Sequence, residues 1–112
     1  MKFFVTYQMP HTGLDEWMKL PEEERKSQEF QMQTEWNAWM EGQKDALLES
    51  AGVGKPKRVS ADGIEDSRND IMMYSFVEAD SLDAAALMFK DHPHFGIPGG
   101  WIEVMAVNKD IG

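Results

Sequence analysis

The chain has 112 residues, no cysteine and a formal net charge of −9, with 42% hydrophobic and 28% charged residues. This length supports one core, so we expect a single domain over residues 1–112. The acidic balance disfavours nucleic acid as a partner, and the one short basic cluster, Lys55-Pro56-Lys57-Arg58, does not offset it. Without cysteine the chain has no disulfide framework, thiolate nucleophile or cysteine-based metal site.

The distribution of apolar residues argues against a membrane partner. No apolar run approaches the roughly 18 residues that a membrane span needs. The first seven residues alternate in polarity, unlike a signal peptide. We therefore expect a cytoplasmic protein.

The amino-terminal residues predict a strand and then a helix start. The strand covers residues 2–9, where Phe3, Val5, Tyr7 and Met9 alternate with the other positions. Pro10 ends the strand because it has no amide hydrogen for a ladder. Residues 12–15 resemble a helix start with a threonine cap. Pro21, with three glutamates after it, resembles a second helix start.

A long helix is predicted from about residue 21 to Ser50, and Ser27 is the candidate position for a break. Its apolar stripe has spacings of three and four and consists of Met32, Trp36, Trp39, Met40, Leu47 and Leu48. Gly52 suits the left-handed cap that would end this helix.

The carboxy-terminal half predicts two strands, a helix and a last strand. A weaker strand covers residues 55–61, and Asp62-Gly63 opens a polar hairpin connection that runs to Asp70. The strongest strand covers residues 71–77. A helix then begins at Ser81, carries Leu82, Ala85, Ala86 and Phe89 on one side, and ends at His92-Pro93. The last strand covers residues 101–107.

The order strand, helix, strand, strand, helix, strand predicts an α+β protein with the ferredoxin-like βαββαβ fold and helices on one face of an antiparallel sheet. A sheet covered on one face should alternate apolar and polar residues. In the strands at 71–77 and 101–107 both faces are apolar, and Glu103 is the single charge in the second of them. We therefore predict a homodimer that pairs sheet face to sheet face.

Four segments carry a resemblance to a known family. They are Asp62-Gly63, residues 78–85, His92-Pro93-His94 and residues 98–104. In order and spacing they resemble the YCII-related proteins of the DGPF subgroup. The resemblance covers most of the carboxy-terminal half, and it implies a ferredoxin-like protomer in a dimeric α+β barrel.

The chain departs from the pattern of this family at three positions. The Asp-Gly-Pro-Phe signature survives as Asp62-Gly63-Ile64-Glu65. Many members carry an aspartate before the proline that follows the second helix, where this chain has His92. They also carry a histidine on the first long helix, at a position that falls near Glu41. The resemblance therefore implies that the two catalytic roles are replaced or exchanged.

Two interpretations remain open for the histidine pair. His92 and His94 supply imidazoles that titrate near neutral pH, as a general base or acid requires. In the structural interpretation His92 caps the carboxyl end of the helix and His94 begins a loop packed on Phe95. His11, at the end of the first strand, is expected at the opposite end of the sheet from this pair, so we predict no metal site.

Two polar residues lie near the aromatic stripe of the long helix. Glu41 is a candidate partner for His92 in a half-buried cleft, or else a solvated helix residue. Gln43 falls on the stripe itself, so its side chain needs a partner from the protein or from a ligand.

Trp36, Trp39, Met40 and Tyr74 either line an apolar pocket between helix and sheet or form plain core. No phosphate-binding glycine loop, serine nucleophile elbow, haem motif or flavin motif is present, so we predict no cofactor.

The leading interpretation is a small-molecule-binding protein that catalyses proton transfer, as an isomerase or lyase, with His92 as base or acid, Glu41 as its partner and His94 in the binding site. The alternative is a non-catalytic binding or accessory module that uses the same scaffold. A cofactor-free oxygenase is a third possibility without separate support in the sequence.

Overall fold

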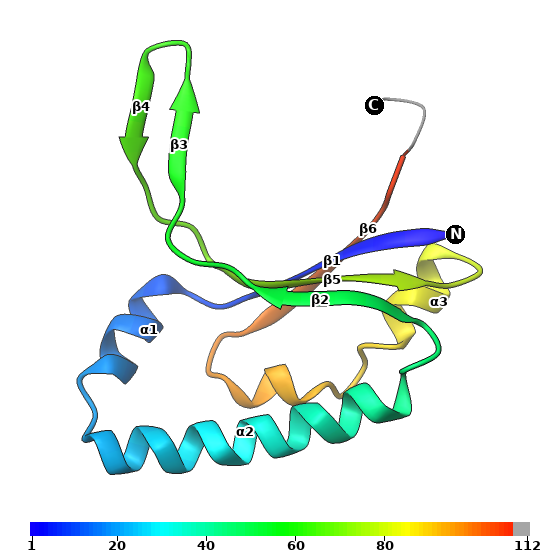
Figure 1. The fold of residues 1–112 in the computed structure, drawn as a ribbon, viewed down its shortest axis with the longest axis horizontal. Helices are drawn as coiled ribbons and strands as arrows, with labels where there is room; N and C mark the ends of the chain where they lie inside the picture. Colours follow the sequence, from blue (N-terminus) through cyan, green and yellow to red (C-terminus); the bar gives the residue numbers. More distant parts are fainter. Residues whose placement is uncertain (109–112) are drawn as a thin grey trace.

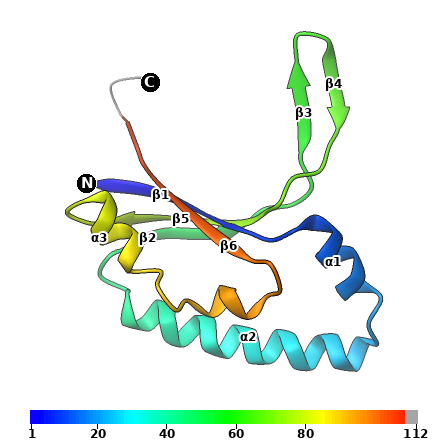
Figure 2. The same cartoon turned by 180° about the vertical axis from the view of Figure 1, so that it is seen from behind.

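A computed structural model describes residues 1–108 and has the ferredoxin-like α+β fold. One antiparallel sheet has the order β2-β5-β1-β6, with β1 (Lys2–Gln8), β2 (Leu47–Gly52), β5 (Ile71–Glu78) and β6 (Trp101–Ala106). On one side of it lie α1 (His11–Met18), α2 (Glu22–Gly42) and the 3₁₀ helix η1 (Pro93–Gly96), as Figures 1 and 2 show. The short α3 (Leu82–Leu87) lies at the end of the sheet where β1 begins.

The core forms where the central strand β1 meets the helices. Alternate side chains of β1 face the helix layer, and Phe3, Val5 and Tyr7 are at most 1% exposed. They pack with Trp36 of α2 and with Val77 of the neighbouring strand β5. Full burial of each large apolar side chain contributes about 1.5–3 kcal/mol, so this face of β1 anchors the fold.

The predicted long helix ends eight residues early, at Gly42 instead of Ser50. The carbonyl of Gln43 accepts hydrogen bonds from the amides of Ala46 and Leu47, both at 3.0 Å, and these bonds turn the chain back toward the sheet. Leu47 and Leu48 therefore belong to β2. The helical spacing continued into this segment by chance, and pairing with β5 overrides it.

The amino-terminal part of the helical region also differs from the prediction. α2 runs unbroken through Ser27, and the break lies instead between α1 and α2, where Pro21 precedes α2. α1 begins at His11, and Thr12, the residue expected to cap it, makes no capping hydrogen bond. The carboxylate of Asp70 accepts the hydrogen bond of the His11 amide at 3.0 Å instead.

The strand expected at residues 55–61 exists but is not part of the main sheet. It forms β3 (Lys57–Ser60), which pairs with β4 (Gly63–Asp66) in a separate two-stranded sheet. Every residue of these two strands is exposed. The β3–β4 hairpin projects from the main sheet on the side opposite α2 (Figures 1 and 2). Gly63, with φ 133°, follows the turn of this hairpin. Gly52, which was expected to cap the long helix, instead ends β2.

The carboxy-terminal elements follow the prediction closely. The hydroxyl of Ser81 accepts a hydrogen bond from the Ala84 amide at 3.1 Å and so caps α3. α3 ends at Leu87, earlier than the predicted end at His92-Pro93. The last strand ends one residue before Val107.

The sheet face away from the helices is apolar at its centre. Phe4, Tyr74 and Phe76 form a ring cluster there, with centroids 5.1–6.0 Å apart. Glu103, also on this face, accepts hydrogen bonds from Gln8 Nε2 at 2.8 Å and Trp101 Nε1 at 2.9 Å. Its charge is therefore partly satisfied within the chain.

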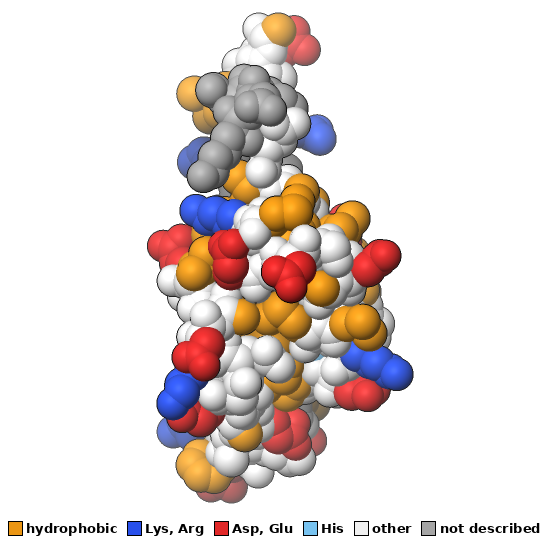
Figure 3. All heavy atoms as spheres, turned by 90° about the vertical axis from the view of Figure 1, so that its right-hand side faces the viewer, with side chains coloured by type: hydrophobic (Ala, Val, Ile, Leu, Met, Phe, Trp, Pro, Cys, Tyr) orange, Lys and Arg blue, Asp and Glu red, His pale blue; other side chains and the backbone are white. Residues whose placement is uncertain are grey.

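Seen from the end that carries the amino terminus and α3, apolar side chains form a band through the middle of the molecule, with charged side chains on both sides (Figure 3). Among residues 1–108 no helix combines the length and the apolar character that crossing a bilayer requires.

Candidate functional site

The loop between α3 and β6 places His92. Asp91 has φ 60°, in the left-handed region that residues other than glycine seldom adopt. His92 itself is extended, with φ −62° and ψ 144°, as steric contact with the following Pro93 requires. The loop buries the His92 side chain beneath α2, where the residue is 2% exposed.

His92 lies in a cluster of aromatic rings, which we call the His92 cluster. Its ring centroid is 4.3 Å from Trp39 and 4.6 Å from Trp36, both in T-shaped arrangements, and 5.4 Å from Tyr7. Phe89 completes the cluster at 5.9 Å. Three elements, β1, α2 and the loop after α3, thus hold the imidazole in one orientation.

The hydrogen bonds of His92 define its tautomer. Nδ1 accepts a hydrogen bond from the His94 amide at 2.9 Å, so the neutral ring carries its proton on Nε2. This bond caps η1 at its amino end, whereas the structural interpretation expected a cap at the carboxyl end of the preceding helix. Nε2 is buried and has no hydrogen-bond partner within residues 1–108.

Burial lowers the pKa of His92 from 6.5 to about 4, and the nearby positive charge of protonated His94 acts in the same direction. The imidazole is therefore neutral at physiological pH. A neutral ring with Nδ1 occupied offers one group for chemistry, the Nε2 hydrogen-bond donor.

His94 ties η1 to the sheet. It is 1% exposed, and its Nε2 lies 2.7 Å from the carbonyl oxygen of Gln8. Its ring packs edge-on against Phe95 at 6.5 Å, as the structural interpretation predicts. Burial lowers the pKa of His94, and its hydrogen bonds to the backbone of Gln8 and Trp101 oppose that shift.

The expectation that His11 lies at the opposite end of the sheet from the histidine pair was wrong. Because β6 runs antiparallel to β1, its first residue, Trp101, pairs with Gln8 at the end of β1. The loop before β6 therefore reaches the same end as His11. The ring of His11 nevertheless pairs with Asp70, at 2.9 Å.

A chain of hydroxyl groups runs beneath the His92 cluster. Tyr7 Oη lies 2.9 Å from Ser75 Oγ, which lies 2.8 Å from Ser50 Oγ, and Ser50 also donates to the carbonyl of Tyr74 at 3.3 Å. Burial raises the pKa of Tyr7 to about 12, although the hydrogen bond with Ser75 acts in the other direction. Tyr7 is thus a hydrogen-bonding group and stays protonated at neutral pH.

The structure places Glu41 and Gln43 away from His92. The Glu41 side chain is 75% exposed and pairs with Lys44 at 3.3 Å, whereas His92 is buried. Gln43 is half-buried at the carboxyl end of α2, where its backbone makes the turn into β2. The two residues therefore do not lie in the His92 cluster.

The four predicted pocket residues divide between the two faces of the sheet. Trp36, Trp39 and Met40 face the core from α2, and Trp39 Nε1 donates to the carbonyl of Met88 at 3.3 Å. Tyr74 contacts Phe4 on the opposite face of the sheet. A pocket between helix and sheet therefore cannot contain all four.

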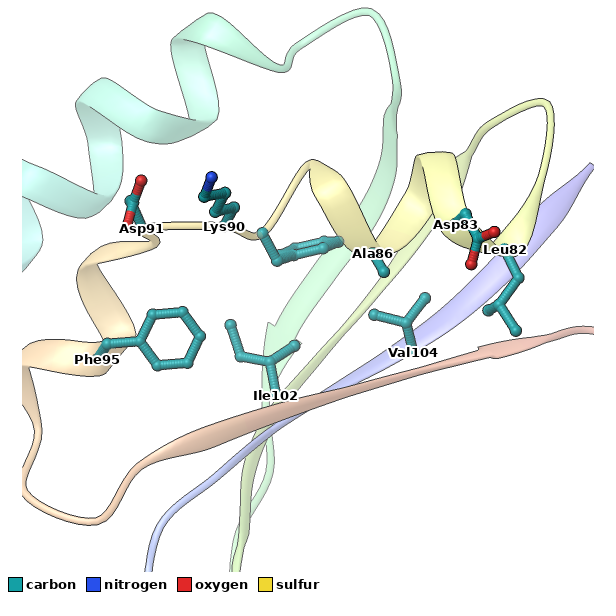
Figure 4. A pocket seen from close by; sticks show the side chains of 9 residues that line it. Leu82, Asp83, Ala86, Lys90, Asp91, Phe95, Ile102 and Val104 are labelled. Carbon is teal, nitrogen blue, oxygen red and sulfur yellow. The ribbon is translucent and has the colours of Figure 1, made fainter.

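A cleft of 620 Å³ opens between α3, the loop after it and β6. Figure 4 shows Phe95, Ile102, Ala86 and Val104 facing the space between these elements, while Lys90 and Asp91 point toward α2. Phe89 lines this cleft and also contacts His92, so its ring stands between the cleft and His92.

Sequence reasoning missed Asp91 and Phe89, which both line this cleft. Asp91 had a usable signal, because it stands next to His92. The sequence pattern places Phe89 on the apolar side of its helix, and Phe89 does belong to the core. Within residues 1–108 no group of three or more histidine or carboxylate side chains has an arrangement that could hold a metal ion.

Comparison with known proteins identifies a shared fold. No protein-family model and no curated protein matches this chain. One similar solved structure is the 5-chloro-2-hydroxyhydroquinone dehydrochlorinase (TftG) from Burkholderia phenoliruptrix AC1100, in complex with 2,5-dihydroxybenzoquinone. The two superpose with a TM-score of 0.58 at 12% identity, over 96% of this chain and 94% of the other. The chain thus shares its α+β fold with this dehydrochlorinase.

Proposed function

We propose that this chain is a single-domain, cytoplasmic, YCII-related protein of the DGPF subgroup. It forms a homodimer, binds a small planar organic molecule and catalyses proton transfer as an isomerase or lyase. The proposal rests chiefly on the buried, unpartnered Nε2 of His92.

A buried donor without a partner costs about 1–3 kcal/mol, so its presence calls for a compensating role. A ligand oxygen that gains negative charge during reaction is a suitable partner, because a fixed neutral donor in a dry site stabilises such a charge strongly. His92 therefore acts as the hydrogen-bond donor to a developing enolate or phenolate oxygen. With Nδ1 occupied by the His94 amide, it is less suited to act as the base.

Asp91 is our candidate for the base. Asp91 adjoins His92 in sequence and lines the 620 Å³ cleft. Its exposed carboxylate points toward α2 (Figure 4), and in our proposal a rotation about the Cα–Cβ bond turns it to the ligand. Its left-handed backbone, at φ 60°, is the type of local strain that clusters at functional sites. The exposed ion pair of Glu41 with Lys44 gives no support to Glu41 in this role.

The cleft supports an aromatic or quinonoid ligand. Phe89, Phe95 and Ile102 provide an apolar surface for a flat ring. The structural neighbour is a dehydrochlorinase in complex with a dihydroxybenzoquinone, and this agrees with an elimination on a similar scaffold. In our proposal the ring of Phe89 moves aside to bring the ligand oxygen to His92.

The sheet face away from the helices supports the homodimer. Its ring cluster of Phe4, Tyr74 and Phe76 is only partly covered by the chain itself. Glu103, the charge on this face in β6, already has two donors, so its burial against a second copy costs less than that of a bare carboxylate.

A ligand screen followed by hydrogen exchange tests the proposal. Substituted hydroquinones and benzoquinones are screened by thermal shift, and each compound that binds is incubated with the protein in D₂O. We expect C–H exchange or elimination, observed by NMR, with the wild-type protein, and at least a 100-fold slower rate with Asp91→Asn. Asparagine also tolerates the left-handed backbone, so this variant removes the charge alone.

His92→Asn provides the second comparison. Its side-chain oxygen still caps η1, but no donor remains at the position of Nε2. We expect the rate to fall while the fold, monitored by circular dichroism, is kept. Unchanged rates in both variants would contradict the proposed roles.

A non-catalytic binding module is the second candidate. The separation of exposed Glu41 from buried His92 favours it, because the catalytic pair that the sequence suggested does not assemble. In this case compounds bind and raise the melting temperature, but none exchanges a proton or eliminates a group in D₂O.

A further inference from the structure

A second cleft, of 230 Å³, lies where α1 begins and where the segments before β3 and β5 pass each other. Its apolar wall includes Met9, Leu14, Val53 and Met72. None of the roles assigned above to His92, Asp91 or the 620 Å³ cleft uses it. It contains the remaining histidine of the chain and two residues of the short basic cluster noted in the sequence, Lys55 and Pro56.

His11 and Asp70 form an oriented dyad in this cleft. Asp70 Oδ1 accepts two hydrogen bonds from His11, one from its backbone amide at 3.0 Å and one from Nδ1 at 2.9 Å. The backbone bond alone would cap α1, and the second bond fixes the ring. The proton of the neutral His11 ring then lies on Nδ1, so its Nε2 keeps a lone pair. His92 has the opposite tautomer, with its proton on Nε2.

The dyad is accessible and its carboxylate is ionised. The side chains of His11 and Asp70 are 42% and 35% exposed, so a solute can reach them. The hydrogen bond from the His11 ring, and then that from its amide, hold the pKa of Asp70 below its usual value. An ionised aspartate behind Nδ1 is the arrangement that makes an imidazole a good proton acceptor.

Two cations line the same cleft. Lys55 and Arg68 come from the segments on either side of the β3–β4 hairpin. Asp70 is the one carboxylate among the residues that line the cleft, so Lys55, Arg68 and Asp70 together leave one net positive charge. Asp15 of α1, which does not line the cleft, pairs with Arg68 at 3.4 Å. This balance suits a ligand with one negative charge better than a doubly charged phosphate.

We propose that this cleft is a second binding site, which takes a small monocarboxylic acid with a compact apolar body. The carboxylate binds Lys55 and Arg68, and the apolar body lies on Met9, Leu14 and Val53. A hydroxyl or other acidic proton of the ligand faces Nε2 of His11. The site is independent of His92 and Asp91.

Benzoate and benzamide are the probes that test the site, because they share a shape and differ in charge. Binding is measured by ¹H–¹⁵N NMR titration of the full chain at low ionic strength. We expect saturable binding of benzoate, with shifts at His11, Lys55 and Arg68, and at least tenfold weaker binding of benzamide. Equal binding of the two probes, or no saturable binding of benzoate, would overturn the proposal.

Single substitutions locate the site. Arg68→Ala is expected to weaken benzoate binding about tenfold and Lys55→Ala several-fold. Lys57→Ala is the matched control, because Lys57 pairs with Asp66 on the β3–β4 hairpin and does not line the cleft. Equal weakening by all three would indicate only a general charge effect and would count against the site.

A last comparison separates this site from the proposed catalytic site. Asp91→Asn is expected to leave benzoate binding unchanged, and Arg68→Ala to leave quinone binding unchanged. If Asp91→Asn weakened benzoate binding, the two ligands would share one site and the inference of a second site would fail.

Discussion

Gly100 lies directly against His94. A Cβ atom at position 100 would lie 3.1 Å from the carbonyl oxygen of His94 and 3.2 Å from its Nε2, and also 3.2 Å from the carbonyl oxygen of Ile97. Two of these neighbours are backbone atoms of the loop that positions the histidine pair. The close approach explains why the chain has glycine where the loop enters β6.

Gly100→Ala should therefore destabilise the protein by about 1–3 kcal/mol, because the loop has to shift to admit a methyl group. Urea unfolding monitored by tryptophan fluorescence measures this. Gly42→Ala is the control, since a Cβ there meets nothing within 4 Å and alanine favours the end of α2. Equal stability of the two variants would contradict the tight packing at position 100.

Stability should fall as the pH decreases from about 6.5 to 4. The unfolded chain binds a proton at His92 near pH 6.5, whereas the folded chain keeps the pKa of His92 at about 4. The unfolded state therefore holds more protons in this range and is favoured as pH falls, by up to about 3 kcal/mol at 1.36 kcal/mol per pH unit. The lowered pKa of His94 adds to the loss.

Urea unfolding at pH 7.0 and 5.5 measures this dependence, because most carboxylates titrate at lower pH. His92→Phe removes the ionisable group and should reduce the difference between the two pH values. If the wild-type protein were equally stable at both, His92 would not be buried as described.

One of the two tyrosines of the chain should ionise only near pH 12. Ultraviolet absorbance of phenolate during a pH titration detects it. Tyr7→Phe should abolish this late component and cost about 1 kcal/mol of stability, because the hydroxyl loses its hydrogen bond with Ser75. A titration curve that is unchanged by Tyr7→Phe would exclude the assignment.

Phe76→Glu should convert the proposed dimer to a monomer, because it introduces a charge into the ring cluster on the sheet face away from the helices. Sedimentation velocity at several concentrations gives the molar mass. Phe30→Glu is the matched control: the same change is made on α2, where Phe30 is 75% exposed. A wild-type protein that stays monomeric at all concentrations would rule out the dimer.

The elements of the fold could be predicted where local and tertiary signals agree. β1 shows apolar alternation, β5 and β6 are short, mostly apolar runs, and the cap at Ser81 uses a side chain adjacent in sequence. The prediction for the region around β2 was wrong because Leu47 and Leu48 continue the helical spacing of α2. Only pairing with β5 makes this segment a strand, and pairing partners distant in sequence leave no local signal.

The candidate sites were less predictable for the same reason. The sequence identified His92, but its tautomer depends on a bond to His94 that exists only after η1 forms. His11 and Asp70 are 59 positions apart, and the pairing of β1 with β5 brings them together. Neither relationship is encoded in the spacing of residue types.

The β3–β4 hairpin should differ greatly from the main sheet in how long its backbone hydrogen bonds stay closed. Its strands are exposed on both faces, and an isolated hairpin in water is only marginally stable. Its amides should exchange with solvent in the folded protein within seconds, while those of central β1 exchange only on global unfolding. The hairpin is thus the place where a label, an affinity tag or a protease site can be inserted without cost to the core that holds His92.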